Sequence, residues 1–442
     1  MKLNRRTFIG GLAAGAAISL QSGGATAASR RVIVVGGGMG GASLAKYLRL
    51  WSNRTIEVTL VEPSSTYVSN IMSNLVITGQ MKRAALNHDY SKLEKKYGVK
   101  LVKGRVTAIS DASGGVRQVT VSTPSGTIVL KAEKVALSPG ISFSPVTRFG
   151  SGEVVPILHA WVGGPQTELL KKELAEMPAG GRFVLTIPKA PFRCPPGPYE
   201  RACLVADFLK REKPGSKIIV LDENPGIVAE AESFGKAFNE TYRGVLDYRP
   251  GMRVVGVSNN NRTIRYKPVS AAEGEPFVSL TAAVLNVIPP NRANAIVRTA
   301  GLTDDSGFAP VDVRSFESTI AGKAGLHVLG DSSNSTGLPK AGHVANQGAK
   351  ICAAAIINKF AGLPVEKGPV ANSACFSPVS STKASWLTAV YHYDTVQRKM
   401  VVKTMSNGKL VAADPVEAAR PTAENFAQMK TWYRVLMDDT FA

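Results

Sequence analysis

The chain has 442 residues, a length that corresponds to two or three domains. Its composition, 44% hydrophobic and 19% charged with 42 Gly and 26 Pro, excludes collagen-like, coiled-coil and low-complexity classes. Four cysteines without a Cys-x-x-Cys-His run exclude a small disulfide scaffold and a c-type haem attached to this chain. The net charge of +20 suits an anionic partner, but basic runs are short and lack interleaved aromatics, so we expect no nucleic-acid partner.

The first 27 residues have the pattern of an export signal. A basic head containing Arg5 and Arg6 precedes a mildly apolar stretch from Phe8 to Leu20, and Ala25-Thr26-Ala27 resembles a cleavage site. The apolar stretch is too short for a membrane span. The paired arginines resemble a twin-arginine signal, which exports folded proteins. We therefore expect a periplasmic protein that acquires its cofactor before export.

A dinucleotide-binding pattern follows this signal directly. An apolar strand from Arg31 leads into Gly36, Gly38 and Gly41, which satisfy G-x-G-x-x-G before a helix. The first glycine allows the tight turn, the second lets a pyrophosphate approach, and the third lets the helix pack on the strand. A second strand ends in Glu62, whose carboxylate is placed to accept ribose hydroxyls. This order of elements predicts a nucleotide site.

A later segment favours FAD over NAD at that site. The apolar strand that begins at Leu326 ends at Asp331, and a loop containing Lys340 leads to a helix over 344–360. In flavoproteins with two dinucleotide domains, such an aspartate binds the ribityl chain, and the following helix points its positive end at the flavin. The segment 135–140 has the pattern of the strand that returns the chain to the FAD domain.

The middle of the chain repeats the strand–helix–strand pattern with a different turn. Strands at 182–188 and 217–222 flank a helix at 199–211, but the turn at 189–200 holds four prolines and one glycine. Proline lacks an N–H group, and its ring fills the space that a pyrophosphate needs. We therefore expect this second unit to keep the fold without binding NADH.

Three segments together carry a family resemblance over essentially the whole chain. They are Phe192-Arg193-Cys194-Pro195-Pro196-Gly197-Pro198-Tyr199-Glu200-Arg201, Asn286-Val287-Ile288-Pro289-Pro290 and Asp438-Asp439-Thr440-Phe441. With the export signal and the FAD motif, they resemble the flavoprotein subunit of flavocytochrome c sulfide dehydrogenase. The resemblance implies an α/β fold with two Rossmann-like, glutathione-reductase-type domains and an α+β C-terminal domain. The implied boundaries are 1–27 for the signal, 30–145 and 280–361 for the FAD-binding domain, 146–279 for the second Rossmann-like domain and 370–442 for the C-terminal domain.

The resemblance also implies a catalytic site. Cys194 and Cys375 match a redox-active disulfide beside the flavin; hydrosulfide would attack one sulfur, form a persulfide and release a thiolate that reduces FAD. Glu200 matches the active-site glutamate and Trp432 a tryptophan near the flavin. Asn70 takes the position where family members often attach FAD to cysteine, so we expect FAD to be held non-covalently.

We expect the other two cysteines to be structural and the histidines not to bind a metal. Cys203 and Cys352 lie among apolar neighbours in helices and are expected to be core thiols. The five histidines lack metal-ligand spacing, so we expect no metal.

Four functions follow as alternatives. The first is an exported sulfide dehydrogenase that oxidises sulfide to sulfur or polysulfide and passes electrons to a c-type cytochrome. The second is a sulfide:quinone oxidoreductase that lies on a membrane surface through the amphipathic helix at 423–436. The third is an NADH-dependent disulfide reductase, which the proline-rich turn disfavours. The fourth is a flavin-retaining binding or assembly subunit without turnover.

Overall fold

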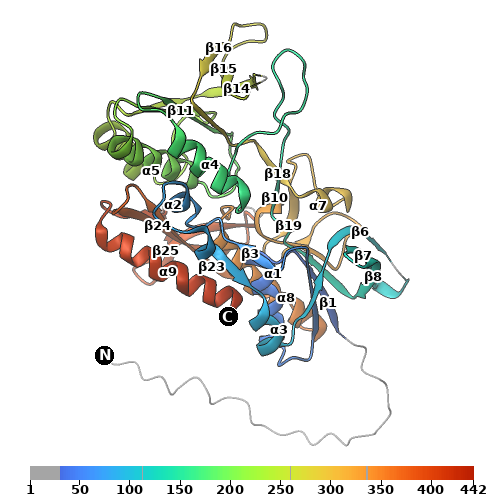
Figure 1. Cartoon of the computed structure of the whole chain (residues 1–442). Coiled ribbons are helices and arrows are strands. Elements are labelled where there is room, and N and C mark those ends of the chain that lie inside the picture. Colours follow the sequence, from blue (N-terminus) through green and yellow to red (C-terminus); the bar gives the residue numbers. More distant parts are fainter. Residues whose placement is uncertain (1–29, 112, 259, 335–336) are drawn as a thin grey trace, which may run out of the picture.

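The computed structural model describes residues 30–442 except 112, 259, 335 and 336. The predicted signal at residues 1–27 lies outside this range. Figure 1 shows three regions that follow the expected α/β architecture, with α9 and β23–β25 packed beside the first domain.

The first domain is built on a mostly parallel sheet. Within the described residues it has eight strands in the order β22-β19-β20-β21-β9-β1-β2-β5. The bounds are β1 Arg31–Val35, β2 Glu57–Glu62, β5 Lys100–Lys103, β9 Lys134–Leu137, β19 Ala309–Asp312, β20 Glu317–Ser318, β21 Leu326–Val328 and β22 Ser333–Asn334. Val32 to Val35 are buried because both faces of a parallel sheet are covered.

Two helices cover this sheet and begin at its functional edge. They are α1 (Met39–Trp51) and α8 (Gly342–Phe360), which pack against each other (Figure 1). The predicted helix at 344–360 is therefore confirmed with two more residues at its start. Smaller elements complete the domain: β3 Thr66–Val68, α2 Ser73–Ile77, β4 Asn87–Asp89, α3 Ser91–Tyr97, β6 Arg105–Asp111, β7 Arg117–Thr123, β8 Gly126–Ala132, β10 Ile141–Phe143, β18 Asn291–Ala293 and α7 Ala295–Thr299.

The central domain repeats the parallel arrangement on a smaller scale. Its sheet has the order β13-β12-β11-β17 in the described residues, and a separate antiparallel sheet is formed by β14-β15-β16. The bounds are α4 Pro165–Glu176, β11 Arg182–Ile187, α5 Gly197–Glu212, β12 Lys217–Asp222, α6 Ala231–Lys236, β13 Leu246–Pro250, β14 Met252–Val257, β15 Thr263–Pro268, β16 Val278–Thr281 and β17 Val284–Val287.

One boundary differs from the sequence prediction. We expected residues from 280 onward to belong to the FAD-binding domain, but β17 pairs in parallel with β11, Val184 lying opposite Leu285. The central domain therefore extends through Val287. The physical reason is that a short apolar strand is buried equally well in either parallel sheet, so its sequence alone does not choose between them.

The C-terminal region is an antiparallel sheet followed by a long helix. The strands are β23 Val370–Pro378, β24 Ala384–Asp394, β25 Lys399–Ser406, β26 Lys409–Ala412 and β27 Val416–Glu417, and the helix is α9 (Ala423–Phe441). The helix returns to the first domain: Lys46 of α1 donates to the Asp439 carbonyl at 2.8 Å, and Phe441 stacks on Tyr67 with ring centroids 5.1 Å apart. Its apolar side, including Met429 and Leu436, is buried in the protein core.

Candidate functional site

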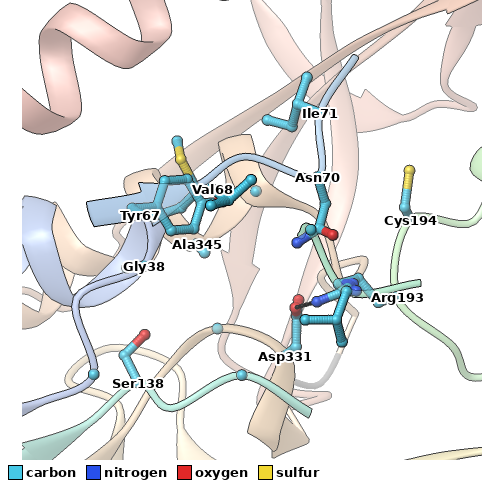
Figure 2. Close-up of a pocket in the computed structure, with 18 of the residues that line it drawn as sticks. Gly38, Tyr67, Val68, Asn70, Ile71, Ser138, Arg193, Cys194, Asp331 and Ala345 are labelled. Atoms are coloured by element: carbon cyan, nitrogen blue, oxygen red, sulfur yellow. Dashed lines mark ion pairs between the residues drawn. The ribbon is translucent and has the colours of Figure 1, made fainter. Parts of the chain in front are cut away.

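A pocket of about 520 Å³ lies where the three regions meet. Its wall holds nine of the residues predicted from the sequence: Gly36, Gly38, Glu62, Asn70, Cys194, Glu200, Asp331, Cys375 and Trp432. Figure 2 shows Asn70, Arg193, Cys194 and Asp331 on one side of this pocket and Gly38 with Tyr67 on another. The glycine turn, the cysteine loop and the C-terminal sheet therefore face one space.

The glycine turn provides a cradle without side chains. Gly36 has φ +95°, and a Cβ on Gly41 would lie 1.8 Å from the Gly36 carbonyl oxygen, so α1 packs directly on the turn. Gly41 itself does not line the pocket; it acts through this close packing. A Cβ on Gly38 would meet only the Tyr67 ring, at 3.7 Å, and would project into the pocket. These three positions match the roles that the motif predicts.

Two of the helices that reach the pocket, α1 and α8, begin there with bare N-termini. Neither α1 nor α8 has an acidic residue in its first turn or a side-chain cap. Gly38 to Gly40 of the α1 start and Ala341 to His343 of the α8 start line the pocket. Unpaired N–H groups and the positive helix end favour an anionic ligand group there.

Glu62 lies at the end of β2 and is held in place by the backbone. One carboxylate oxygen accepts from the Gly37 amide at 2.8 Å and the other from the Ser64 amide at 2.9 Å. Each oxygen keeps a further lone pair toward the pocket, so the carboxylate is placed to accept ribose hydroxyls.

Asp331 connects the predicted flavin site to the cysteine loop. Its carboxylate lies 4.0 Å from the guanidinium of Arg193, an ion pair drawn in Figure 2. Burial raises the pKa of Asp331, and the charges of Arg193 and Lys340 oppose that rise. Lys340 does not line the pocket: its ammonium is turned inward and donates to the carbonyls of Asp331 at 3.0 Å and Ser333 at 2.6 Å. Lys340 was predicted to contact the cofactor directly, but in the structure it holds the backbone of the loop that carries Asp331.

These features fit FAD. The open cradle at Gly38 and the α1 N-terminus suit the pyrophosphate, Glu62 the ribose, Asp331 the ribityl chain and the α8 N-terminus the flavin ring. Asn70 lies in the same wall, at the position where the family resemblance places a cysteine that attaches FAD.

The two predicted redox cysteines share the pocket as free thiols. Cys194 and Cys375 both line it, but they are not bonded in this structure, so the predicted disulfide is not formed here. Cys194 has φ +55°, and its amide donates to the Lys340 carbonyl at 2.7 Å, which ties the cysteine loop to the start of α8. Burial raises the pKa of both thiols, that of Cys375 to about 12. Cys203 and Cys352 are fully buried in α5 and α8, as expected for core thiols.

Glu200 stands in the first turn of α5 and is 8% exposed. Burial raises its pKa to about 8, while a hydrogen bond from Asn74 and the charge of Arg201 oppose the rise. Asn74 donates to the Glu200 carboxylate at 2.9 Å and accepts from Arg201 at 2.9 Å. This places a proton-exchanging group beside the cysteines with a pKa near neutrality. Sequence reasoning missed Asn74 and Arg201; Arg201, adjacent to Glu200 in the proline-rich motif, was the available signal.

Trp432 lies in the pocket wall opposite the start of α8. Its ring centroid is 6.1 Å from that of His343 and 5.6 Å from that of Phe376. His343 in turn accepts a hydrogen bond from the Ala374 amide at 2.9 Å. Trp432 thus packs the middle of α9 against β23, the strand that carries Cys375.

The second nucleotide position is filled by the protein's own side chains. Asp222 ends β12, as Glu62 ends β2, but it is completely buried. Tyr199 and Tyr248 donate to one of its oxygens at 2.7 and 2.8 Å, and Asn224 donates to the other at 2.7 Å. An acid saturated in this way has no free position for the adenosine ribose of NADH.

One family model matches the central part of the chain. Residues 167–289 match the family model described as "Sulfide dehydrogenase [flavocytochrome c] flavoprotein chain, central". This match covers residues 167–289, and over them it confirms the resemblance inferred from the sequence and the expectation of a flavin-dependent oxidoreductase.

Solved structures show the same fold at low identity. The sulfide:quinone oxidoreductase from Aquifex aeolicus is 16% identical, with a TM-score of 0.69 over 93% of this chain and 92% of that chain. The covalent putidaredoxin reductase–putidaredoxin complex is 16% identical, with a TM-score of 0.59 over 93% of both chains. The NAD-dependent persulfide reductase from A. fulgidus is 14% identical, with a TM-score of 0.56 over 92% of this chain and 77% of that chain. The predicted fold class is confirmed.

The described residues hold neither a cluster of metal ligands nor a membrane-spanning helix. Among them, three or more His, Cys, Asp or Glu side chains do not gather into a group suited to a metal ion. Nor does any helix in this part of the chain have the length and apolar character needed to cross a bilayer.

Proposed function

We propose that the protein is an exported sulfide dehydrogenase. It oxidises sulfide to sulfur or polysulfide through Cys194, Cys375 and non-covalent FAD, and a c-type cytochrome accepts the electrons in the periplasm. The observation that carries the proposal is that cysteines from two different domains line the same pocket as the dinucleotide cradle.

The chemistry assigned to this chain begins with Cys194 and Cys375 joined as a disulfide. Hydrosulfide attacks one sulfur, the bond between the cysteines breaks, and one cysteine becomes a persulfide while the other leaves as a thiolate. Glu200, held by Asn74, exchanges protons at this site. Bound FAD supplies the two-electron acceptor.

The rival functions have weaker support. A membrane role for α9 requires its apolar side, and Met429, Leu436 and Met437 are buried inside the protein instead. An NADH reductase requires the second nucleotide position, where Asp222 is buried and hydrogen-bonded by Tyr199, Tyr248 and Asn224. The basic net charge, +17 without residues 1–27, suits an acidic cytochrome.

The test is an anaerobic titration of the Cys194→Ser variant with sulfide, followed by the visible flavin spectrum. We expect the variant to retain FAD but to lose sulfide-driven bleaching, because Cys194 belongs to the reacting pair. Cys203→Ser, which changes a buried thiol in the same helix region, is the matched control and should bleach as the wild type does. Normal bleaching of Cys194→Ser would disprove the cysteine mechanism, and bleaching of the wild type by NADH but not by sulfide would disprove the function.

A further inference from the structure

A second cavity, of about 350 Å³, reaches Cys375 between the central and C-terminal domains. It shares Cys375, Pro196 and Ala341 with the first pocket, whereas Cys194 lines only the first. Cys375 is therefore accessible from two sides, and Cys194 faces the cofactor pocket alone. A nucleophile that displaces Cys194 from Cys375 approaches opposite the leaving sulfur. The second cavity offers a face of Cys375 that Cys194 does not line.

One carboxyl group in this cavity lacks its expected partners. Glu230 is 2% exposed, and its backbone has φ +53°, a conformation that favours glycine. Ser377 donates to one carboxyl oxygen at 2.6 Å, but the other oxygen is buried without a hydrogen-bond partner among the described residues. Such burial and backbone strain cost free energy, and they are typical of functional sites.

The rest of the cavity selects for a small neutral molecule. Leu387, Ala389 and Tyr391 of β24 form one apolar wall, and Val228, which is 39% exposed, lies at the rim. In the second acid of the wall, Glu417, one carboxylate oxygen accepts from both the amide and the hydroxyl of Ser233, at 3.2 and 3.1 Å. An apolar wall with carboxyl groups disfavours an anion, so hydrosulfide is excluded more strongly than neutral hydrogen sulfide.

We propose that this cavity admits neutral hydrogen sulfide to Cys375 and that Glu230 accepts its proton. The inference rests on the proposed function. The Glu230 carboxylate takes one proton from hydrogen sulfide, and the resulting hydrosulfide attacks Cys375 Sγ. The bond between the two cysteine sulfurs breaks, Cys375 becomes a persulfide, and Cys194 leaves with the electron pair as a thiolate. The sulfide sulfur is oxidised and the disulfide is the oxidant.

The groups around Glu230 suit it to this exchange. Burial raises the pKa of Glu230 to about 8; the charges of Glu417 and Glu200 raise it further, and the Ser377 and Ser385 hydroxyls lower it. The Cys375 thiol also faces this carboxyl, and Glu230 contributes to its raised pKa. A base whose pKa lies near the working pH is present in both protonation states and transfers protons efficiently.

The first experiment compares Glu230→Gln with the wild-type holoenzyme by anaerobic stopped-flow bleaching with sulfide. Glutamine keeps the shape of the side chain but does not accept the proton, so near pH 8, where about half of Glu230 is ionised, we expect about a 100-fold slower reaction. In mildly acidic buffer the wild-type carboxyl is itself protonated and accepts no proton, so the difference should shrink. Glu232→Gln, at an exposed position on the same α6 segment, is the control and should match the wild type.

A merely structural role for Glu230 would slow the reaction equally at both pH values, which would overturn the assignment. Equal rates for Glu230→Gln and wild type would overturn it as well. If sulfide does not bleach the wild type at all, the proposed function itself fails. The results thus distinguish the two failures.

The second experiment tests the cavity without sulfide turnover. In Cys194→Ser holoenzyme, FAD bound in the first pocket would leave the second cavity as the path by which methyl methanethiosulfonate reaches Cys375. Adding Val228→Trp at the rim should slow labelling of Cys375, measured by mass spectrometry, by about tenfold because access limits the reaction. Unchanged labelling would overturn the proposed entry path. This variant alters a rim residue, so the test holds even if Glu230→Gln does not fold.

Discussion

The two strand–helix–strand units of this protein have the same topology, but only the first leaves room for a nucleotide. In the first, β1 and β2 flank a glycine turn, and Glu62 keeps its free lone pairs toward an open pocket. In the second, β11 and β12 flank a proline-rich turn, and both carboxylate oxygens of Asp222 accept hydrogen bonds from the protein's own side chains. Topology therefore places an acid at the same strand end in both units, but the turn decides whether a nucleotide has room beside it.

The turn and helix of the second unit contribute reactive side chains to the pocket of the first unit. Its turn carries Cys194 with φ +55°, and its helix begins with Gly197 and Glu200, which line the pocket of the first unit. A fold that elsewhere binds a reductant here supplies a thiol and a proton-exchanging acid.

The sharpest test of the comparison is Gly41→Ala in the first unit. A Cβ there would lie 1.8 Å from the Gly36 carbonyl oxygen, so α1 would have to move away from the turn. We expect the free energy of unfolding to fall by more than about 3 kcal/mol and FAD to be lost, measured by urea unfolding and flavin absorbance.

The matched control is Gly38→Ala, whose Cβ meets only the Tyr67 ring at 3.7 Å. This variant should fold normally and bind FAD about tenfold more weakly, because the methyl group enters the space for the pyrophosphate. Equal stability of the two variants would contradict the packing role assigned to Gly41.

In the second unit, Asp222→Ala should destabilise the fold without affecting FAD. The substitution leaves the buried hydroxyls of Tyr199 and Tyr248 without their acceptor, at a cost of about 3 kcal/mol in urea unfolding. Flavin content should be unchanged, and NADH should still not bleach the flavin. Asp247→Ala removes a half-exposed ion pair between two residues of β13, Asp247 and Arg249. It should lower the free energy of unfolding by less than about 1 kcal/mol. A gain of NADH binding by Asp222→Ala would show that the second site is closed by this acid alone.

The most gradual predicted effect is a pH dependence that arises from Glu200. Burial raises its pKa from 4.5 to about 8, so between these values the folded protein holds a proton that the unfolded chain has released. The stability contribution is complete below the lower value and is lost as pH rises through the higher one, by about 1 kcal/mol per pH unit at most.

Glu200→Gln should therefore show a shallower loss of stability between about pH 5 and pH 8 than wild type, in urea unfolding followed across this range. Glu232→Gln, an exposed acid, should keep the wild-type slope. Parallel curves for wild type and Glu200→Gln would contradict the burial of an uncharged Glu200.

Much of the site was predictable because it rests on local signals. The glycine spacing, the acid at the end of β2 and the strand leading to Asp331 each combine a periodic apolar run with a residue type that has one strong structural use. The segments 385–393 and 399–405 carry the same kind of local signal and form β24 and β25.

The features that sequence reasoning missed depend on distant contacts. Asn74 is joined to Glu200 only because α2 folds against α5. Glu230 follows a Pro-Gly segment whose composition is typical of exposed loops, and its burial comes from β23, which supplies Ser377. Lys340 lies in the predicted loop, but whether its ammonium points into the pocket or back to the Asp331 carbonyl is settled by packing.

The contact between Phe441 and Tyr67 determines when, during synthesis, the wall of the nucleotide pocket can be completed. Tyr67 forms part of the wall of the nucleotide pocket and is backed by an aromatic ring from the far end of the described chain. A ribosome that adds 5 to 20 residues per second needs about 20 to 75 s to travel from residue 67 to residue 441. The pocket wall is therefore complete only after translation has passed residue 441, and the nascent first domain must wait for that ring before it holds its ligand in the final geometry.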